Sequence, residues 1–142
     1  MSTYSQRLKL VQLTAISSLL FALIGFSYNV WRMQASEHNA NIRDASFEML
    51  LQLSELELII YAGHYDQDSK LGSPRKGWVK VGLINDLSLI TTPSVQNSTK
   101  QLKQTWQQHW QSYQQQQQST NEIVAQIDQV RVEVRALLKD LN

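Results

Sequence analysis

A stretch of 22 residues without a charged side chain lies between Lys9 and Arg32. As an α-helix this stretch would be about 33 Å long, which matches the hydrocarbon thickness of a bilayer. Tyr28 and Trp31 lie at its C-terminal end, where aromatic rings are typical of the headgroup boundary. The sequence therefore predicts a transmembrane anchor over residues 10–31, with the membrane lipid bilayer as its first partner.

A cleaved signal peptide is the alternative interpretation of the same stretch. The apolar region of a signal peptide is usually about 7 to 15 residues long and ends in a small-x-small cleavage site. Here the apolar stretch is longer, and the candidate site Met33-Gln34-Ala35 has a large first residue. These two differences favour a retained anchor.

The tail ahead of the anchor, residues 1–9, carries Arg7 and Lys9 and no acidic residue. Short basic segments are favoured on the cytoplasmic side of a membrane. We therefore expect a single-pass protein with a cytoplasmic tail over residues 1–9 and an extracytoplasmic domain over residues 32–142. In a bacterial cell with two membranes, the anchor would lie in the inner membrane and the domain in the periplasm.

Small or polar side chains recur within the anchor at spacings of three and four residues, so they share one side of a helix. They are Ala15, Ser18, Ala22, Gly25 and Asn29. Such a stripe lets two helices approach closely in lipid, which predicts contact with a protein partner or a second copy of the chain. Small residues are also common in membrane helices without a partner, and this is the alternative.

The composition of the region beyond Arg32 excludes several classes of function. It holds ten Lys and Arg against twelve Asp and Glu, a net charge of −2. No nucleic acid is expected as a partner, because its binding relies on a net basic face. The chain has no cysteine, so disulfides, thiolate metal sites and a cysteine nucleophile are excluded.

The two prolines predict where helices begin. Both follow a hydroxyl residue, as Ser73-Pro74 and Thr92-Pro93, and a hydroxyl N-cap before proline is typical of a helix start. Gly82 and several β-branched residues leave a strand open for residues 74–90. We expect an all-α fold, an extramembrane bundle of three or four helices with coiled-coil packing as one arrangement. The predicted helices cover about residues 33–62, 74–90, 93–118 and 119–141.

Apolar residues in the first of these helices cover more than one narrow stripe. They are Phe47, Met49, Leu50, Leu51, Leu53, Leu56, Leu58, Ile59 and Ile60. A helix that covers only one side of a core has a single apolar stripe. We therefore expect neighbours to bury this helix on two sides.

From Val95 to Leu141 a seam of mostly apolar positions repeats at spacings of four and three residues, a pattern typical of a bundle core or coiled coil. Five glutamines at residues 114–118 weaken the seam, and Ser119 to Glu122 match a capping box. One unbroken helix would be about 73 Å long. We favour a break at Ser119 with the glutamine run as linker, and a continuous helix is the alternative.

No residue pattern specifies catalysis, a cofactor site or a metal site, so we do not expect an enzyme. The three histidines are far apart, and within the predicted helices none has a second ligand at helical spacing. Asp66 and Asp68 resemble the opening of a calcium loop, but Lys70 occupies its third ligand position.

Two segments are candidates for contact with a partner. The connection around Tyr65 carries Arg75 and Lys76 at the start of the next helix, where the helix dipole disfavours cations, and it ends at Trp78. An ordinary polar connection with Trp78 in the core is the alternative. The second candidate is an aromatic stripe that contains Trp106 and Trp110, for which core packing is the default interpretation.

The preferred hypothesis for function is a membrane-anchored helical scaffold or adaptor in the cell envelope that acts through protein–protein contacts. The alternative is an extracytoplasmic sensory or ligand-binding bundle, similar in layout to the four-helix domains of bacterial receptors, which would signal through a partner. An N-terminal anchor followed by extracytoplasmic helices also resembles the layout of a phage inner-membrane spanin. No motif distinguishes these hypotheses.

Overall fold

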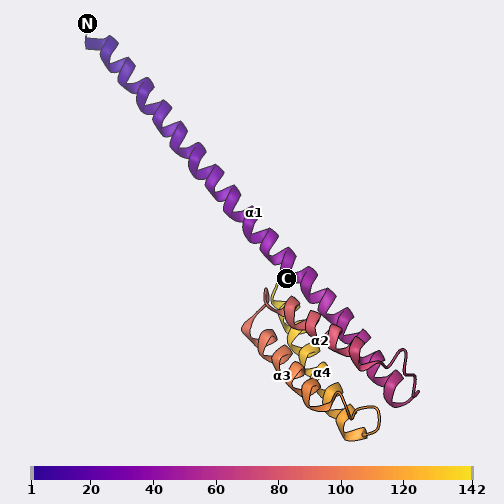
Figure 1. Cartoon of the computed structure of the whole chain (residues 1–142). Coiled ribbons are helices and arrows are strands. Elements are labelled where there is room, and N and C mark those ends of the chain that lie inside the picture. Colours follow the sequence, from indigo (N-terminus) through magenta and orange to yellow (C-terminus); the bar gives the residue numbers. More distant parts are fainter. Residues whose placement is uncertain (1, 142) are drawn as a thin grey trace. The chain divides into compact units, whose positions relative to one another are not determined.

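The structure, a computed structural model, describes residues 2–141. Within this range the chain forms helices and turns and no strand. The helices are α1 (Ser2–His64), α2 (Pro74–Ser88), α3 (Pro93–His109) and α4 (Gln117–Asp140) (Figure 1). The all-α prediction is confirmed, and the strand left open for residues 74–90 is wrong.

Residues 1–39 and residues 40–142 form two separate units. In the first unit, α1 exposes large apolar side chains from Leu10 to Trp31. The helix is long and apolar enough to cross a membrane. It therefore meets the length and composition requirements of the predicted spanning segment.

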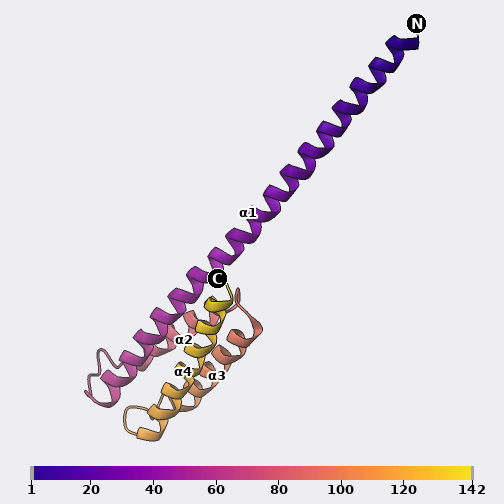
Figure 2. The same ribbon diagram turned by 180° about the vertical axis from the view of Figure 1, so that it is seen from behind.

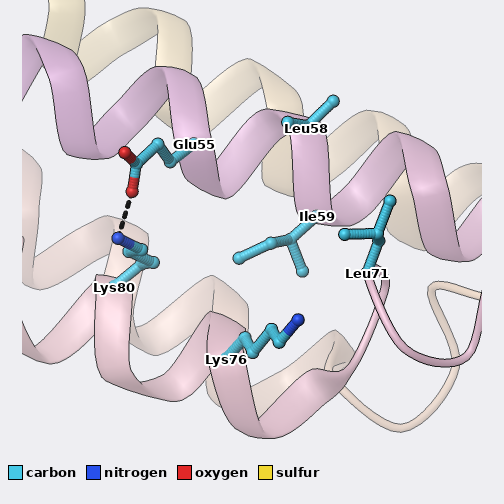
Figure 3. A pocket seen from close by; sticks show the side chains of 6 residues that line it. All are labelled: Glu55, Leu58, Ile59, Leu71, Lys76 and Lys80. Carbon is cyan, nitrogen blue, oxygen red and sulfur yellow. Dashed lines mark hydrogen bonds and ion pairs between the residues drawn. The ribbon is translucent and has the colours of Figure 1, made fainter.

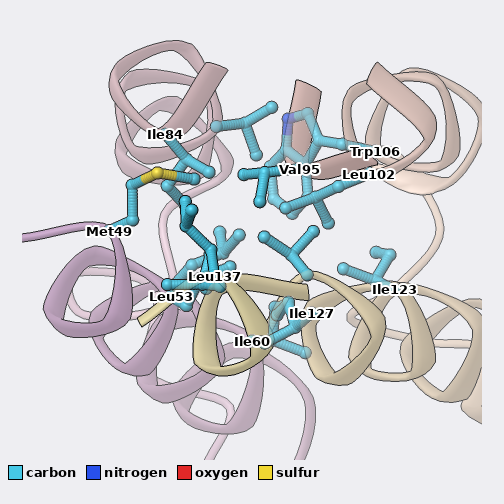
Figure 4. Packing of buried hydrophobic residues seen from close by; sticks show 14 of the residues in the cluster. Met49, Leu53, Ile60, Ile84, Val95, Leu102, Trp106, Ile123, Ile127 and Leu137 are labelled. Carbon is cyan, nitrogen blue, oxygen red and sulfur yellow. The ribbon is translucent and has the colours of Figure 1, made fainter. Parts of the chain in front are cut away.

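In the second unit, α2, α3, α4 and the part of α1 after residue 39 lie side by side, and successive helices run in opposite directions (Figures 1 and 2). All four contribute to one hydrophobic core (Figure 4). Burial of one such Leu, Ile or Met side chain contributes about 1.5–3 kcal/mol. The buried core includes Met49, Leu53, Leu56, Ile60, Val81, Ile84, Val95, Leu102, Trp106, Ile123, Ile127, Val130 and Val134.

Helices α2 and α3 begin at the predicted prolines. Ser73 and Thr92 are the N-cap residues, both with extended backbone, and Pro74 and Pro93 stand at the first helical position. Neither hydroxyl makes a side-chain cap hydrogen bond. The fixed φ of proline, and not a hydroxyl cap, is therefore the local feature that favours these starts.

The break between the last two helices occurs earlier than expected. Helix α3 ends at His109 and α4 begins at Gln117, with Gln116 as N-cap. Ser119 is therefore inside the first turn of α4 and not its cap. The cause is Tyr113, which is fully buried and donates a hydrogen bond from its hydroxyl to the carbonyl oxygen of Gly72 at 2.5 Å. Burial of this ring bends the chain into a turn that includes the first three glutamines of the run, and the last two belong to α4.

The prediction that α1 is buried on two sides holds only in part. Met49, Leu53 and Ile60 are fully buried, and Ile59 is buried beside them. Phe47, Leu51 and Leu58, expected in the core, are exposed. Neighbouring helices cover less of α1 than its apolar residues would allow, because α2 and α4 pack on it and no further helix of residues 2–141 covers the remaining side.

Two ion pairs connect α1 to its neighbours. Glu55 pairs with Lys80 of α2, and Glu57 pairs with Arg131 of α4. Burial alone would lower the pKa of Arg131, but the hydrogen bonds to Glu57 and Asp128 outweigh it and raise the pKa. These pairs fix the register of α1 against both helices.

Candidate protein interface on helices α1 and α2

The exposed side of α1 carries apolar residues at helical spacing. Leu51 and Leu58 are seven residues apart, so they lie on the same side of the helix, and Leu58 is 62% exposed. Glu55 lies between them on the same side and is half-buried by its ion pair with Lys80. An exposed leucine pair in this register gives α1 a second apolar side that faces away from the core.

Helix α2 continues this surface. Val79 and Leu83 are four residues apart and both exposed, Val79 to 68%. Leu71, in the connection before α2, is also exposed. We call the surface formed by Leu51, Leu58, Leu71, Val79 and Leu83 the α1–α2 face. Exposed apolar residues that gather in one place are typical of protein interaction sites.

A groove lies within this face (Figure 3). Its volume is about 240 Å³. The lining residues are Glu55, Leu58, Ile59, Leu71, Lys76 and Lys80. The Lys80 ammonium donates to Gln52 Oε1 at 2.7 Å and pairs with Glu55. Leucine and isoleucine therefore form the walls, and one unpaired ammonium, that of Lys76, lies at the edge.

The predicted cationic residues lie at one end of the face. Arg75 and Lys76 are exposed in the first turn of α2, and among the described residues the side chain of neither makes a hydrogen bond or an ion pair. Asp68 lies nearby. Its Oδ1 accepts hydrogen bonds from the backbone N–H groups of Leu71 and Lys70, at 2.9 and 2.8 Å, and these bonds, with a smaller contribution from Lys76, lower its pKa.

Other residues of the predicted connection have structural contacts. The ring of Tyr65 is exposed, and its hydroxyl accepts a hydrogen bond from Gln117 Nε2 at 3.0 Å. Trp78 is half-buried and packs against Trp106 and Trp110, with ring centroids 6.3 and 6.2 Å apart. Tyr65 therefore contacts α4, whereas Trp78 belongs to the aromatic cluster.

The predicted aromatic stripe on α3 is part of the core and not of a surface. Trp106 is fully buried and Trp110 is half-buried. Gly77 of α2 makes room for this packing, since a Cβ at that position would lie 2.3 Å from two ring carbons of Trp106. The indole N–H of Trp106 has no hydrogen-bond partner among the described residues. Shape, and not hydrogen bonding, therefore holds this ring.

The small-residue stripe of the first unit lies on the surface of α1. Ala15, Ser18, Ala22, Gly25 and Asn29 are all exposed. Ser18 donates its hydroxyl hydrogen to the carbonyl oxygen of Thr14 at 2.8 Å, and no other atom lies within 4 Å of a Cβ built on Gly25. The stripe leaves space for a neighbouring helix.

A polar cluster joins α3 to α4. His109 Nε2 lies 2.7 Å from Glu122 Oε2, and His109 Nδ1 lies 3.1 Å from Ser119 Oγ. A carboxylate, an imidazole and a hydroxyl in series resemble the relay of a hydrolase. Ser119, however, is only 2% exposed, so this cluster stabilises the turn. Among the residues that the structure describes, no three acidic or histidine side chains are grouped as for a metal ion.

These features define a helical bundle whose first helix, α1, begins with a long apolar segment, with an exposed apolar face on α1 and α2. Comparison with models of protein families, with curated proteins and with solved structures finds no match to this chain. The functional argument therefore rests on the site.

Proposed function

We propose that this chain is a membrane-anchored helical scaffold or adaptor of a bacterial envelope, which binds a protein partner through the α1–α2 face. The observation that carries this proposal is the exposure of Leu51, Leu58, Val79 and Leu83 on two adjacent helices. Apolar surface of this kind is stabilised when a partner removes it from water.

The groove favours a protein partner over the alternative of a small-molecule sensor. Sites for small molecules usually enclose about 300–1,000 Å³ and bury most of the ligand, whereas this groove has about 240 Å³. Leu51 and Leu83 do not line the groove but are also exposed on the same two helices. An elongated partner, such as a helix, matches this surface better than a compact ligand does.

The anchor supports the same proposal. Its helix exposes apolar side chains throughout residues 10–31, and burying them in lipid removes them from water. With the tail of residues 1–9 in the cytoplasm, the bundle lies in the periplasm. The stripe that includes Ala22 and Gly25 provides a second surface for a partner helix within the membrane.

Site-specific photo-crosslinking in cells tests the proposal. A photoreactive amino acid replaces Leu58 or Val79, and in matched controls it replaces Gln104 or Gln107, which are exposed on α3. We expect a discrete crosslinked protein from the first two positions and none from the controls. Equal crosslinking at all four positions, or none at any, would contradict a partner site on this face.

A reporter fusion tests the proposed orientation. Alkaline phosphatase, which folds to its active form in the periplasm, is joined after residue 142. We expect an active enzyme, because the acid-free basic tail favours a cytoplasmic N-terminus. An inactive phosphatase together with a fluorescent cytoplasmic reporter at the same position would show the opposite orientation.

A further inference from the structure

The α1–α2 face is positively charged at one end. Lys70, Arg75 and Lys76 are exposed there, and in the part of the chain that the structure describes none of their ammonium or guanidinium groups is in an ion pair. The N-terminus of α2 adds the positive end of its helix dipole. The first turn of α2 holds no acidic residue, and Asp68, which interacts with Lys76, offsets only part of the charge of the three cations. This end therefore favours acidic groups on whatever covers it.

The opposite end of the face is negatively charged. Asp44 and Glu48 precede Leu51 on α1 at helical spacing, and Asp86 follows Leu83 on α2. All three are exposed. The pair between Glu55 and Lys80 sets the antiparallel register, so the acidic residues of both helices lie at the same end. Arg43 donates to the carbonyl oxygen of Leu141 at 3.1 Å, and its guanidinium is thereby directed to the chain after α4.

The two charged ends are separated by apolar surface. From Asp44 to Leu58 the face covers 14 helical steps of α1, or about 21 Å. Four turns of a partner helix cover this length. Four exposed apolar residues lie between the ends: Leu51, Leu58, Val79 and Leu83. A partner helix with an apolar stripe at three- and four-residue spacing would cover them.

We infer that the α1–α2 face binds an amphipathic helix of another protein, with an acidic end over Arg75 and Lys76 and a basic end over Asp44, Glu48 and Asp86. This inference rests on the proposed function and specifies the chemistry of its partner. Two copies anchored in one membrane, as the proposed function implies, would pack in parallel and place like charges against each other, which is unfavourable. A separate helix with opposite charges at its two ends avoids that repulsion.

Two designed peptides of about 18 residues, roughly 27 Å as helices, serve as probes. Both carry the same apolar stripe and the same composition. In the first, the acidic residues occupy the N-terminal turn and the basic residues the C-terminal turn, which also suits its helix dipole. In the second, acidic and basic residues alternate along the helix. Because the second has no charged end, turning it around does not restore the complementarity.

Binding is measured by fluorescence anisotropy with the full chain in lipid nanodiscs, and empty nanodiscs correct for partition into lipid. We expect the first peptide to bind about tenfold more tightly than the second. This ratio corresponds to the combined contribution of two or three weak surface ion pairs to the binding free energy. The difference should shrink as salt is raised from about 0.05 to 0.5 M, because exposed charges are screened.

A charge-reversal variant tests the position of the contact. Arg75→Glu with Lys76→Glu removes the cationic end, and we expect the preference for the first peptide to disappear. The matched control is Lys100→Glu with Arg135→Glu, the same change in net charge at exposed positions on α3 and α4. This control should keep the preference.

Three results would overturn the inference: equal binding of both peptides, no binding of either, or self-association of the chain that crosslinks Leu58 to a second copy and that the peptide does not displace. If the peptides fail while crosslinking at Leu58 and Val79 still recovers another protein, only the partner chemistry proposed here is wrong. If both experiments fail, the proposed function fails as well.

Discussion

The outer sides of the two helix pairs differ in chemistry although all four helices share one core. On the α1–α2 side, apolar residues such as Leu51, Leu58 and Val79 are exposed. Among residues 93–140, all of which the structure describes, Val132 is the single exposed large apolar residue, and the exposed surface of α3 holds Gln101, Gln104, Gln107 and Gln108. The same bundle can therefore have a polar exterior, and the apolar exterior of α1 and α2 is not a requirement of its fold.

The largest change in the free energy of unfolding is expected for a substitution on the core side of α1, whereas a substitution on its outer side should change it little. Leu53 is fully buried and Leu51, two residues earlier, is exposed. Leu53→Ala should lower the free energy of unfolding by about 2–5 kcal/mol, through lost burial and a cavity. Leu51→Ala should change it by less than about 0.5 kcal/mol. Urea denaturation of the full chain in one detergent, followed by circular dichroism, measures both, and similar losses would show that the outer side is also packed.

A second comparison uses two glycines of α2. Gly77→Ala would place a Cβ 2.3 Å from the ring of Trp106, and such overpacking costs about 1–3 kcal/mol. At Gly82 no atom lies within 4 Å of a built Cβ, so Gly82→Ala should stabilise by about 0.5–1 kcal/mol through helix propensity. Both variants are compared by the same denaturation. A neutral Gly77→Ala would mean that Trp106 does not pack on α2.

A third effect concerns the turn between α3 and α4. Ser119 Oγ lies 2.8 Å from Ser112 Oγ and 3.1 Å from His109 Nδ1. Ser119→Ala should therefore cost about 1 kcal/mol, as the loss of a buried hydrogen bond does. Gln115→Ala, at an exposed turn position, is the control and should cost less than about 0.5 kcal/mol. If the two losses are the same, the polar cluster does not stabilise the turn.

The smallest expected effect concerns the pKa of Asp68, which lies near the cationic end of the α1–α2 face. The backbone N–H groups of Leu71 and Lys70 lower the pKa of Asp68 below its ordinary value of 3.8. Because the folded pKa is depressed, the stabilisation is complete above the unfolded pKa and is lost as pH falls through the folded pKa. A carboxyl titration by NMR should give a midpoint below 3.8, and a midpoint at or above this value would contradict the two hydrogen bonds.

The sequence predicted the parts of the fold that depend on local signals. Pro74 and Pro93 marked two helix starts, and the spacing from Val95 identified a seam whose members Leu102, Trp106 and Ile127 are buried. The end of α3 was missed because burial of Tyr113, a tertiary contact with Gly72, overrides the local capping pattern at Ser119.

The candidate interface was predicted less well than the helices. Arg75 and Lys76 were recognised because they oppose the dipole of α2. Leu51 and Leu58 were assigned to the core, since periodicity shows that a helix has two apolar sides but not whether a neighbour covers each one. The fit of Gly77 against Trp106 was also missed. A glycine inside a helix beside an aromatic cluster was the available signal, but the only glycine of this helix interpreted from the sequence was Gly82, as leaving a strand open.

The hydrogen bond from Arg43 to the carbonyl oxygen of Leu141 brings the first and last turns of the second unit together. A unit whose two ends meet can be inserted into another chain, or circularly permuted, with little change in its packing. The second unit thus has the geometry of a domain that can be joined to other proteins. Selection can exchange the part of α1 before residue 40 while the α1–α2 face of the second unit stays the same.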